Sequence, residues 1–290
     1  MASHPPSDAA PQNTPPSAPL SAAAPARAPA LGAKPAPGDS YVQSFARGLE
    51  VIRSFSAGAP RQTLSEVAAY TGLTRAGARR ILLTLQTLGY VDSDGKLFRL
   101  TPRILDLGFA YLSSQPLWNL AEPFMETLVE QVRESCSAAV LDGSDIVYVL
   151  RVPTHKIMRI TLGVGSRLPA YCTSMGRMLL SALPEAELRQ RLAATERTAY
   201  TRHTVTDVQA LADAIAQVRQ QGWALVDQEL EEGLISMAAP ITDRSGQLIA
   251  ALNISGQANR SSAAEMQASM LAPLLATARS ISQLLGQQRS

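Results

Sequence analysis

Apolar residues recur at helical spacing where the chain first carries large side chains. Within the stretch SFARGLEVIRSF, four of them fall three or four positions apart: Phe45, Leu49, Ile52 and Phe55. This pattern predicts a helix with one apolar stripe. The helix is the first element of a region that we place at residues 41–101.

Two further helices are expected in the same region. The second begins after Thr63, because Thr63 and Glu66 have the spacing of a capping box, and Gly72 ends it. Thr74 can cap the third, whose buried face is expected to comprise Ala78, Ile81, Leu82, Leu85 and Leu88. Helices joined by a tight glycine-containing turn are typical of a helix-turn-helix.

A hairpin should follow the third helix. The stretch YVDSDGKLFRLT places two β-prone runs around Asp94 and Gly95, and this dipeptide is a strong hairpin signal. A hairpin after a recognition helix predicts the wing of a winged helix-turn-helix.

The next stretch, TPRILDLGFAYLSS, predicts a linker helix over residues 102–116, with Thr101 as the N-cap and Pro102 in the first turn. Its apolar residues lie all round the helix: Ile104, Leu105, Leu107, Phe109, Ala110, Tyr111 and Leu112. Covering them needs two surfaces. We interpret the helix as a dimerisation element; the alternative is a helix buried inside one chain.

From residue 117 the pattern changes to α+β. Strands are expected in CSAAVLDGSDIVYVLRV, KIMRITLG, LISMAAPIT and QLIAALNIS. Helices are expected around residues 121–132, in MGRMLLSAL, and near 184–193, 207–221 and 262–286. Strands linked as hairpins, with helices between them, predict a mostly antiparallel sheet flanked by helices.

Composition adds a third region. Residues 1–40 hold ten of the 19 prolines and twelve alanines. Such a composition buries too little apolar surface to offset the entropy of ordering, so it predicts a disordered tail. With 290 residues, the rest of the chain is long enough for two modest domains.

Charge is concentrated in the winged region. Residues 41–112 hold nine Lys and Arg against five Asp and Glu, whereas residues 113–290 hold fifteen against seventeen. This asymmetry favours an anionic partner such as nucleic acid. No secretory signal and no run of about 18 apolar residues is present, so we expect a soluble, cytoplasmic protein that does not enter membranes.

The chain has only two cysteines, Cys136 and Cys172, too few for a disulfide framework or a four-ligand zinc site. We expect buried or half-buried thiols in a reducing compartment, and neither a metal nor a cofactor. An enzyme is disfavoured, because His155, His203 and the cysteines lie in separate segments without a nucleophile motif.

Basic side chains at the start of the third helix predict contact with double-stranded DNA. Arg75 and Arg79 are four residues apart, hence on one face, and Arg80 is adjacent. The N-terminal part of a recognition helix enters the major groove, where arginine reads guanine or binds phosphate. The candidate DNA-binding residues are Arg47, Thr74, Arg75, Arg79, Arg80 and Lys96. The alternative is an ordinary solvated helix face.

Five stretches together resemble one family: RGLEVIRSF, GLTRAGARRILLTLQTLGYV, LTPRILDLGFAYL, GSRLPAYCTSMGRMLL and the late ISG. Over residues 41–286 the chain resembles the IclR family of bacterial transcriptional regulators. The likeness is greatest to the branch that controls aromatic-acid catabolism through the β-ketoadipate pathway, including regulators of protocatechuate and 4-hydroxybenzoate genes.

The resemblance implies a GAF-like domain at residues 117–290 that binds a small carboxylic acid such as protocatechuate, 4-hydroxybenzoate or β-ketoadipate. Carried over by position, the effector-binding residues are Thr173, Ser174, Met175, Asp227, Ser236, Asn253 and Ser255. Several members have Gly-Ala where this chain has Ser174 and Met175, which implies a pocket of different size.

The residues support part of that set independently. Alternation in LIAALNIS puts Ile249, Ala251, Asn253 and Ser255 on one strand face, so two polar side chains share an apolar strand. Buried polar groups need partners, and a ligand is one candidate. Thr173 and Ser174 open a helix whose N-terminus suits a carboxylate, with Arg167 or Arg177 nearby. Alternatively, these residues only cap the helix or bond neighbouring backbone.

These observations predict a homo-oligomeric transcription factor, a dimer or tetramer, that binds a pseudo-palindromic operator. The effector is expected to alter the placement of the DNA-binding heads or contacts with RNA polymerase, and activation is favoured. The alternatives are an IclR-type repressor of another carbon-source pathway, or a ligand sensor whose winged helix contacts protein.

Overall fold

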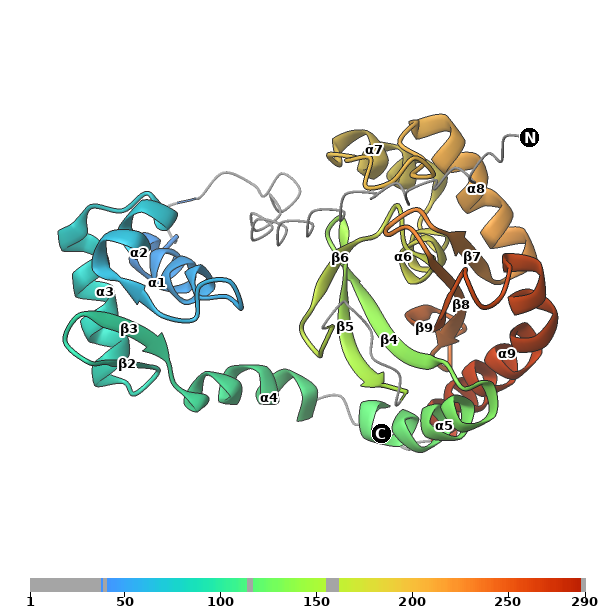
Figure 1. The fold of residues 1–290 in the computed structure, drawn as a ribbon, viewed down its shortest axis with the longest axis horizontal. Coiled ribbons are helices and arrows are strands. Elements are labelled where there is room, and N and C mark those ends of the chain that lie inside the picture. The colour runs from blue at the N-terminus through green and yellow to red at the C-terminus, as the bar shows by residue number, and fades with distance from the viewer. Residues whose placement is uncertain (1–37, 39–40, 114–116, 155–161, 288–290) are drawn as a thin grey trace, which may run out of the picture. The chain divides into compact units, whose positions relative to one another are not determined.

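The computed structural model describes residue 38 and residues 41–113, 117–154 and 162–287. The expected tail, apart from residue 38, and nearly all of the strand expected in KIMRITLG therefore lie outside the described residues, as does His155. The described chain forms two compact units that divide after Thr101. We call them the N-terminal unit, from Gln43, and the C-terminal unit, from Pro102 (Figure 1).

The N-terminal unit is a winged helix. Its elements are α1 (Gln43–Ser54), β1 (Gln62–Thr63), α2 (Leu64–Thr71), α3 (Arg75–Thr87), β2 (Val91–Ser93) and β3 (Leu97–Leu100). The strands form one antiparallel sheet in the order β1-β3-β2. Strand β1 was not predicted, because two residues carry no periodicity.

The predicted ends of α2 and the predicted start of α3 are confirmed. Thr63 and Glu66 form a complete capping box at α2, and Gly72 ends that helix with a left-handed φ of 67°. At α3 the Thr74 hydroxyl accepts a hydrogen bond from the Gly77 N–H at 3.1 Å. These caps satisfy backbone groups that a helix end otherwise leaves unpaired.

The core of this unit gathers seven buried residues: Val51, Val67, Ala68, Ala78, Leu82, Leu85 and Val91. One expectation about it was wrong. Leu88, expected in the buried face of α3, is 50% exposed because it is the C-cap. Only the second half of the α1 stripe packs inward; Phe45 is 68% exposed.

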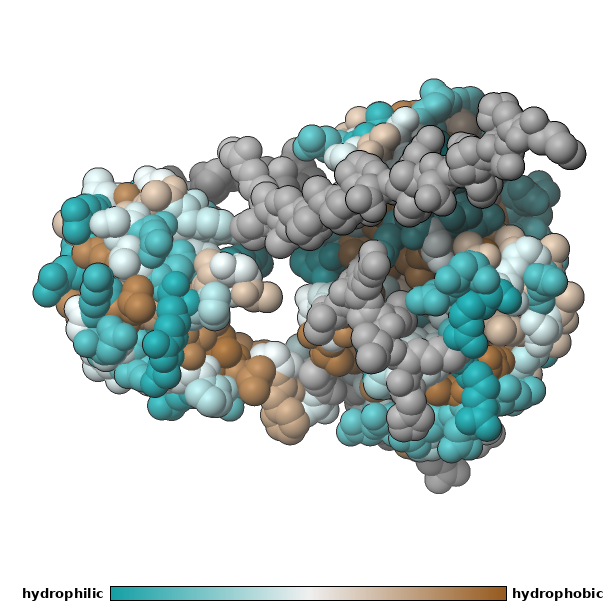
Figure 2. All heavy atoms as spheres, in the orientation of Figure 1, coloured by the Kyte–Doolittle hydropathy of each residue, from teal (hydrophilic) through white to brown (hydrophobic). Residues whose placement is uncertain are grey.

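The C-terminal unit opens with a short 3-10 turn, η1 (Pro102–Ile104), which leads into α4 (Leu105–Ser113). Four large apolar side chains of α4 are exposed: Leu105, Leu107, Phe109 and Tyr111. Figure 2 shows hydrophobic residues, in brown, along this helix. Within the described chain, α4 is therefore not the buried helix that was the alternative reading.

The remaining elements form a sheet between two helical layers. They are α5 (Leu117–Val132), β4 (Ser135–Asp142), β5 (Asp145–Val152), β6 (Arg167–Pro169), α6 (Ser174–Leu180), α7 (Glu185–Ala194), α8 (Val208–Gln221), β7 (Ala224–Asp227), β8 (Leu234–Thr242), β9 (Leu248–Gln257) and α9 (Ala263–Gln287). All strand pairs are antiparallel, in the order β6-β5-β4-β9-β8-β7. The predicted α+β class is confirmed.

Each face of this sheet has its own core. Helices α5 and α9 pack on one face, around Met125, Leu252 and Leu274. Helices α6, α7 and α8 form the other core with Tyr148 and Ala251, on the face that we call the α6–α8 side. The inner strands of the sheet are consequently apolar on both faces, and a polar side chain buried there requires a hydrogen-bond partner.

One predicted strand face is corrected. Ile249 was expected to share a face with Ala251, but it packs on the α5–α9 side. The β8–β9 register skips it, because Ala250 and Leu248 pair with consecutive residues of β8. Such a bulge interrupts the alternation of side chains.

Cys136 and Cys172 are buried free thiols, as predicted. Burial raises the pKa of Cys172 to about 12. Among the described residues, no helix combines the length and the apolar character needed to cross a membrane.

Candidate functional site

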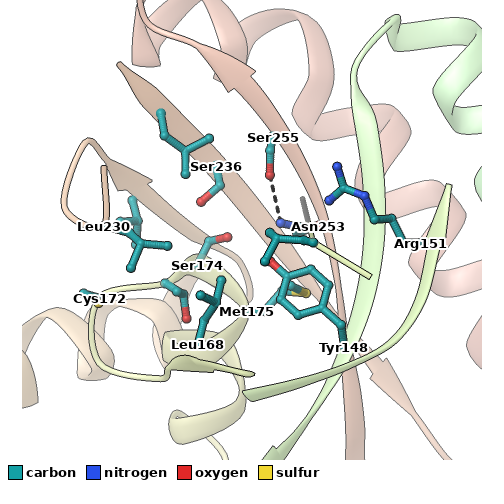
Figure 3. A pocket seen from close by; sticks show the side chains of 14 residues that line it. Tyr148, Arg151, Leu168, Cys172, Ser174, Met175, Leu230, Ser236, Asn253 and Ser255 are labelled. Carbon is teal, nitrogen blue, oxygen red and sulfur yellow. Dashed lines mark hydrogen bonds between the residues drawn. The ribbon is translucent and has the colours of Figure 1, made fainter. Parts of the chain in front are cut away.

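A pocket opens on the α6–α8 side of the C-terminal sheet (Figure 3). It contains about 560 Å³ of space outside atoms, part of it open to solvent. The structure brings six of the seven predicted effector-binding residues to it: Thr173, Ser174, Met175, Ser236, Asn253 and Ser255. The other lining residues are Tyr148, Arg151, Leu162, Leu168, Cys172, Val226, Leu230 and Leu234.

Strand register places the polar side chains in rows across the sheet. Ser255 of β9 lies opposite Ser236 of β8, and Asn253 lies opposite Ser137 of β4. Ser137 in turn lies opposite Arg151 of β5. Residues directly opposite in antiparallel strands share a face, so the side chains of β5, β8 and β9 meet at the pocket; Ser137 of β4 shares their face but is not a lining residue.

Arg151 was not identified from the sequence. Plain alternation from Tyr148 would turn Arg151 to the other face. The β4–β5 register skips Val149, however, and both Val149 and Leu150 pack on the α5–α9 side. This bulge returns Arg151 to the face of Tyr148, and both line the pocket.

Tyr148 and Arg151 give the pocket a donor and a positive charge. Burial raises the pKa of Tyr148 to about 12, against a smaller lowering by the Arg151 charge. The phenol is therefore neutral and able to donate a hydrogen bond at neutral pH. In Figure 3, Arg151 lies on one side of the pocket and Cys172 and Leu230 on the other.

The start of α6 forms another wall. Thr173 caps the helix: its hydroxyl accepts from the Gly176 N–H at 3.2 Å and donates to the Pro169 carbonyl at 3.0 Å. A Cβ at Gly176 would lie 2.1 Å from the Ala170 carbonyl oxygen, so glycine permits this close packing. Thr173 thus has the capping role that was the alternative reading, while still lining the pocket.

Ser174 differs from Thr173. Ser174 is 1% exposed, and its Oγ has no hydrogen-bond partner among the described residues. A buried hydroxyl without a partner costs free energy, which a ligand in the pocket would recover. Met175 beside it is also buried and packs in the α6–α8 core.

Asn253 has the structural role that was the alternative reading, while it and Ser255 also line the pocket. The Asn253 Oδ1 accepts from the Ser137 backbone N–H at 3.1 Å, so it does bond neighbouring backbone. Its Nδ2 donates to Ser255 Oγ at 3.1 Å, drawn as the dashed line in Figure 3. This hydrogen bond joins the two side chains, which together form a polar part of the pocket wall.

Three expected positions lie elsewhere in the described structure. Asp227 is exposed and does not line the pocket, because its neighbour Val226 takes that face of β7. Arg167 pairs with Asp142 at 2.7 Å, and Arg177 is buried in an ion pair with Glu229. Neither arginine lines the pocket.

A second candidate surface lies on the N-terminal unit. Arg75, Arg79 and Arg80 are exposed at the start of α3, and no carboxylate of the described residues pairs with them. Arg47 is exposed on α1. Charges that are held on a rigid helix and not neutralised internally suit an anionic partner.

The wing tip also presents a cation. Lys96 is exposed in the β2–β3 turn, next to Gly95 with a φ of 93°. The Asp94 carboxylate accepts hydrogen bonds from the Lys96 and Leu97 N–H groups at 3.0 and 2.8 Å. The turn is therefore held by its own side chain, while the Lys96 side chain points outward.

Comparison with known proteins gives two family matches. Residues 109–283 match the description "Bacterial transcriptional regulator IclR C-terminal", and residues 44–95 match "IclR helix-turn-helix domain". The first match lies in the unit that contains the pocket, and the second covers most of the winged helix, from α1 to the turn after β2.

Individual relatives agree with these matches. The chain is 44% identical to the Pca regulon regulatory protein of Pseudomonas putida, over 83% of each chain. It is 36% identical to the p-hydroxybenzoate hydroxylase transcriptional activator of Acinetobacter baylyi, over 77% of this chain and 84% of that protein. A crystal structure of an IclR homolog from Microbacterium hydrocarbonoxydans, complexed with 4-hydroxybenzoate, matches with a TM-score of 0.74 and 25% identity, covering 84% of this chain and all of that one.

Proposed function

Because this chain belongs to the IclR family of bacterial transcriptional regulators, we propose that it activates genes of aromatic-acid catabolism when a small aromatic carboxylic acid occupies its pocket. The protein is a regulator with a DNA-binding helix-turn-helix domain and is not an enzyme. In this proposal, residues 41–101 bind DNA, residues 102–116 link and dimerise, and residues 117–290 bind the effector.

The pocket lining is the observation that carries the choice of effector. Arg151 supplies a guanidinium for a carboxylate, while Leu168, Leu230 and Met175 offer apolar walls for a ring. The unpartnered Ser174 Oγ is a hydrogen-bond site for a ring hydroxyl. The relatives named for the Pca regulon and for p-hydroxybenzoate hydroxylase, and the homolog crystallised with 4-hydroxybenzoate, support the same ligand class.

The DNA contacts are proposed from exposure and charge. Arg75 and Arg79 project from the part of α3 that enters a major groove, and Arg80 and Thr74 lie beside them. Lys96 at the wing tip and Arg47 on α1 are proposed to contact phosphates. Because the DNA that it reads is chromosomal, we expect the protein to act in the bacterial cytoplasm.

Regulation requires that effector binding in the C-terminal unit changes how the N-terminal unit acts on DNA. The exposed apolar face of α4 supports a homodimer or homotetramer that holds two winged helices on a pseudo-palindromic operator. The acid shifts the equilibrium between two conformational states of that assembly only to the extent that its affinities for the two states differ. The changed placement of the heads, or a changed contact with RNA polymerase, is the proposed output.

Selection of genomic fragments tests this function. Purified protein is mixed with fragmented chromosomal DNA of the organism that encodes it, with and without 4-hydroxybenzoate or protocatechuate, and the bound fragments are sequenced. We expect fragments upstream of genes for aromatic-acid uptake or ring cleavage, in amounts that change with the acid. Recovery of unrelated promoters would contradict the proposed pathway, and recovery of no DNA would contradict the DNA-binding assignment.

A further inference from the structure

A buried ion pair lies behind the pocket wall. Arg177 of α6 and Glu229, in the turn after β7, are joined by a bond of 2.7 Å between Nη2 and Oε2. Their side chains are only 7% and 8% exposed. Burial of two charges is costly unless each is paired and hydrogen-bonded, so this pair calls for a full account of its partners.

The Arg177 guanidinium ties the pair to the segment that enters α6. Its Nε donates to the Tyr171 carbonyl at 2.9 Å. Tyr171 directly precedes Cys172 and Thr173, which line the pocket. A single guanidinium therefore fixes the approach of this wall segment to the turn that carries Glu229.

Glu229 ties in two other segments. Its Oε2 also accepts from the Val205 N–H at 3.0 Å, and its carbonyl accepts from the Thr204 hydroxyl at 2.6 Å. The next residue in the chain, Leu230, lines the pocket, as does Leu234 at the end of the same turn. The ion pair thus holds two walls, one from the start of α6 and one from the turn after β7.

Both charges also act on the pocket itself. The thiol of Cys172, which lines the pocket, has its pKa raised by burial first; the Glu229 carboxylate raises it further, and Arg177 lowers it. A carboxylate this close would repel an anionic ligand, and the arginine offsets that repulsion.

We propose that the Arg177–Glu229 pair is the positioning and charge-neutralising element that makes this pocket selective for an anion. The pair does not touch the ligand. It holds Cys172 and Leu230 in place and cancels the Glu229 charge, so that the positive charge of Arg151 dominates at the ligand. The inference rests on the proposed function, because it takes an aromatic carboxylate as the occupant.

Calorimetric titration with two probes tests this inference: 4-hydroxybenzoate, which is an anion, and its neutral analogue 4-hydroxybenzamide. Arg177→Met leaves the Glu229 charge unbalanced and is expected to weaken binding of the acid roughly 30-fold, but of the amide roughly threefold or less. Glu229→Gln should raise the ratio of acid to amide affinity. The double variant Arg177→Met with Glu229→Gln should return that ratio to within about threefold of wild type.

Arg177→Lys keeps the positive charge but lacks the planar guanidinium with its several N–H donors. It should lower the affinity for both ligands while keeping the ratio of acid to amide affinity. Arg189→Met is the matched control, because Arg189 forms an exposed ion pair with Glu185 on α7. It should change neither affinity. Thermal unfolding checks that each variant folds; if Arg177→Met does not, Glu229→Gln and the double variant still give the predicted order of ratios.

Two failures are distinguishable. If wild type binds 4-hydroxybenzoate and the ratio of acid to amide affinity is the same in wild type, Glu229→Gln and the double variant, the ion pair is only structural and the inference is wrong. If wild type binds neither this acid nor protocatechuate, the proposed function falls and the inference falls with it.

Discussion

Arg151 is the side chain on which the proposed recognition of an anion depends most. It reaches the pocket only because a bulge in the β4–β5 pairing turns it to the face of Tyr148. Tyr148, with its pKa raised to about 12 by burial, stays protonated and complements the guanidinium as a neutral donor. The two residues combine a charge and a hydroxyl in a largely apolar setting, as small-molecule sites usually do.

Replacing Arg151 by Gln should weaken binding of 4-hydroxybenzoate by roughly 10- to 100-fold, because a hydrogen bond to a charged group contributes about 1.5 to 3 kcal/mol. Binding of 4-hydroxybenzamide should change little. Calorimetry measures both. Arg167→Gln is the control, since Arg167 pairs with Asp142 and Asp145 away from the pocket lining. Equal affinities of Arg151→Gln and wild type for the acid would refute this role.

Met175 sets the size of the pocket in this account. It is 1% exposed, so truncation to Ala should lower the free energy of unfolding by about 2 to 5 kcal/mol and leave a cavity beside the ligand. We expect Met175→Ala to gain affinity for acids with one more ring substituent, such as 4-hydroxy-3-methoxybenzoate. Denaturant unfolding measures the loss of stability, and calorimetric titration measures the affinities for the two acids. If Met175→Ala has the same relative affinities as wild type, Met175 does not determine which acid is bound.

Helices α2 and α3 show how the end of an element is fixed by its own sequence. The caps of α2 and α3 were predictable, because a hydroxyl and the backbone N–H that it accepts from lie within three residues. Strands β1 and β6 were not predicted, since segments of two and three residues owe their existence to distant partners. The positions of Arg151 and Ile249 required the actual register of the sheet, which a single bulge changes. The position of Asp227 required strand β7, which was not predicted either.

Helix α3 carries the prediction about DNA. With a fragment obtained by genomic selection, Arg75→Ala and Arg79→Ala should each weaken binding. Loss of a base contact should cost about 1 to 3 kcal/mol of binding free energy and relax the sequence preference. Loss of a phosphate contact should instead reduce, by about one, the slope of log affinity against log salt concentration. Fluorescence anisotropy over a series of salt concentrations separates the two.

Arg189→Ala, on α7 of the C-terminal unit, is the control for those variants and should leave DNA affinity unchanged. If Arg75→Ala and Arg79→Ala both retain the affinity and salt slope of wild type, these arginines belong to an ordinary solvated face. The helix-turn-helix would then read DNA through other residues.

For the whole molecule, the exposed apolar face of α4 leads us to predict assembly with a second chain. An apolar helix surface of this kind is unfavourable in water, so we expect a second chain to cover it. Sedimentation velocity should find a dimer or tetramer, and Leu107→Ser with Phe109→Ser should shift it to smaller species with weaker operator binding. A wild-type protein that sediments as a monomer would contradict this assembly.

The whole account centres on an aromatic carboxylate in the pocket of the C-terminal unit, and a calorimetric titration of the wild-type protein tests this most directly. The ligands are 4-hydroxybenzoate and protocatechuate, compared with 4-hydroxybenzamide and with pyruvate, which keeps the carboxylate but lacks the ring. We predict saturable binding of at least one of the two aromatic acids, tighter than that of the amide or of pyruvate. No binding of either aromatic acid, or tighter binding of pyruvate, would contradict the account.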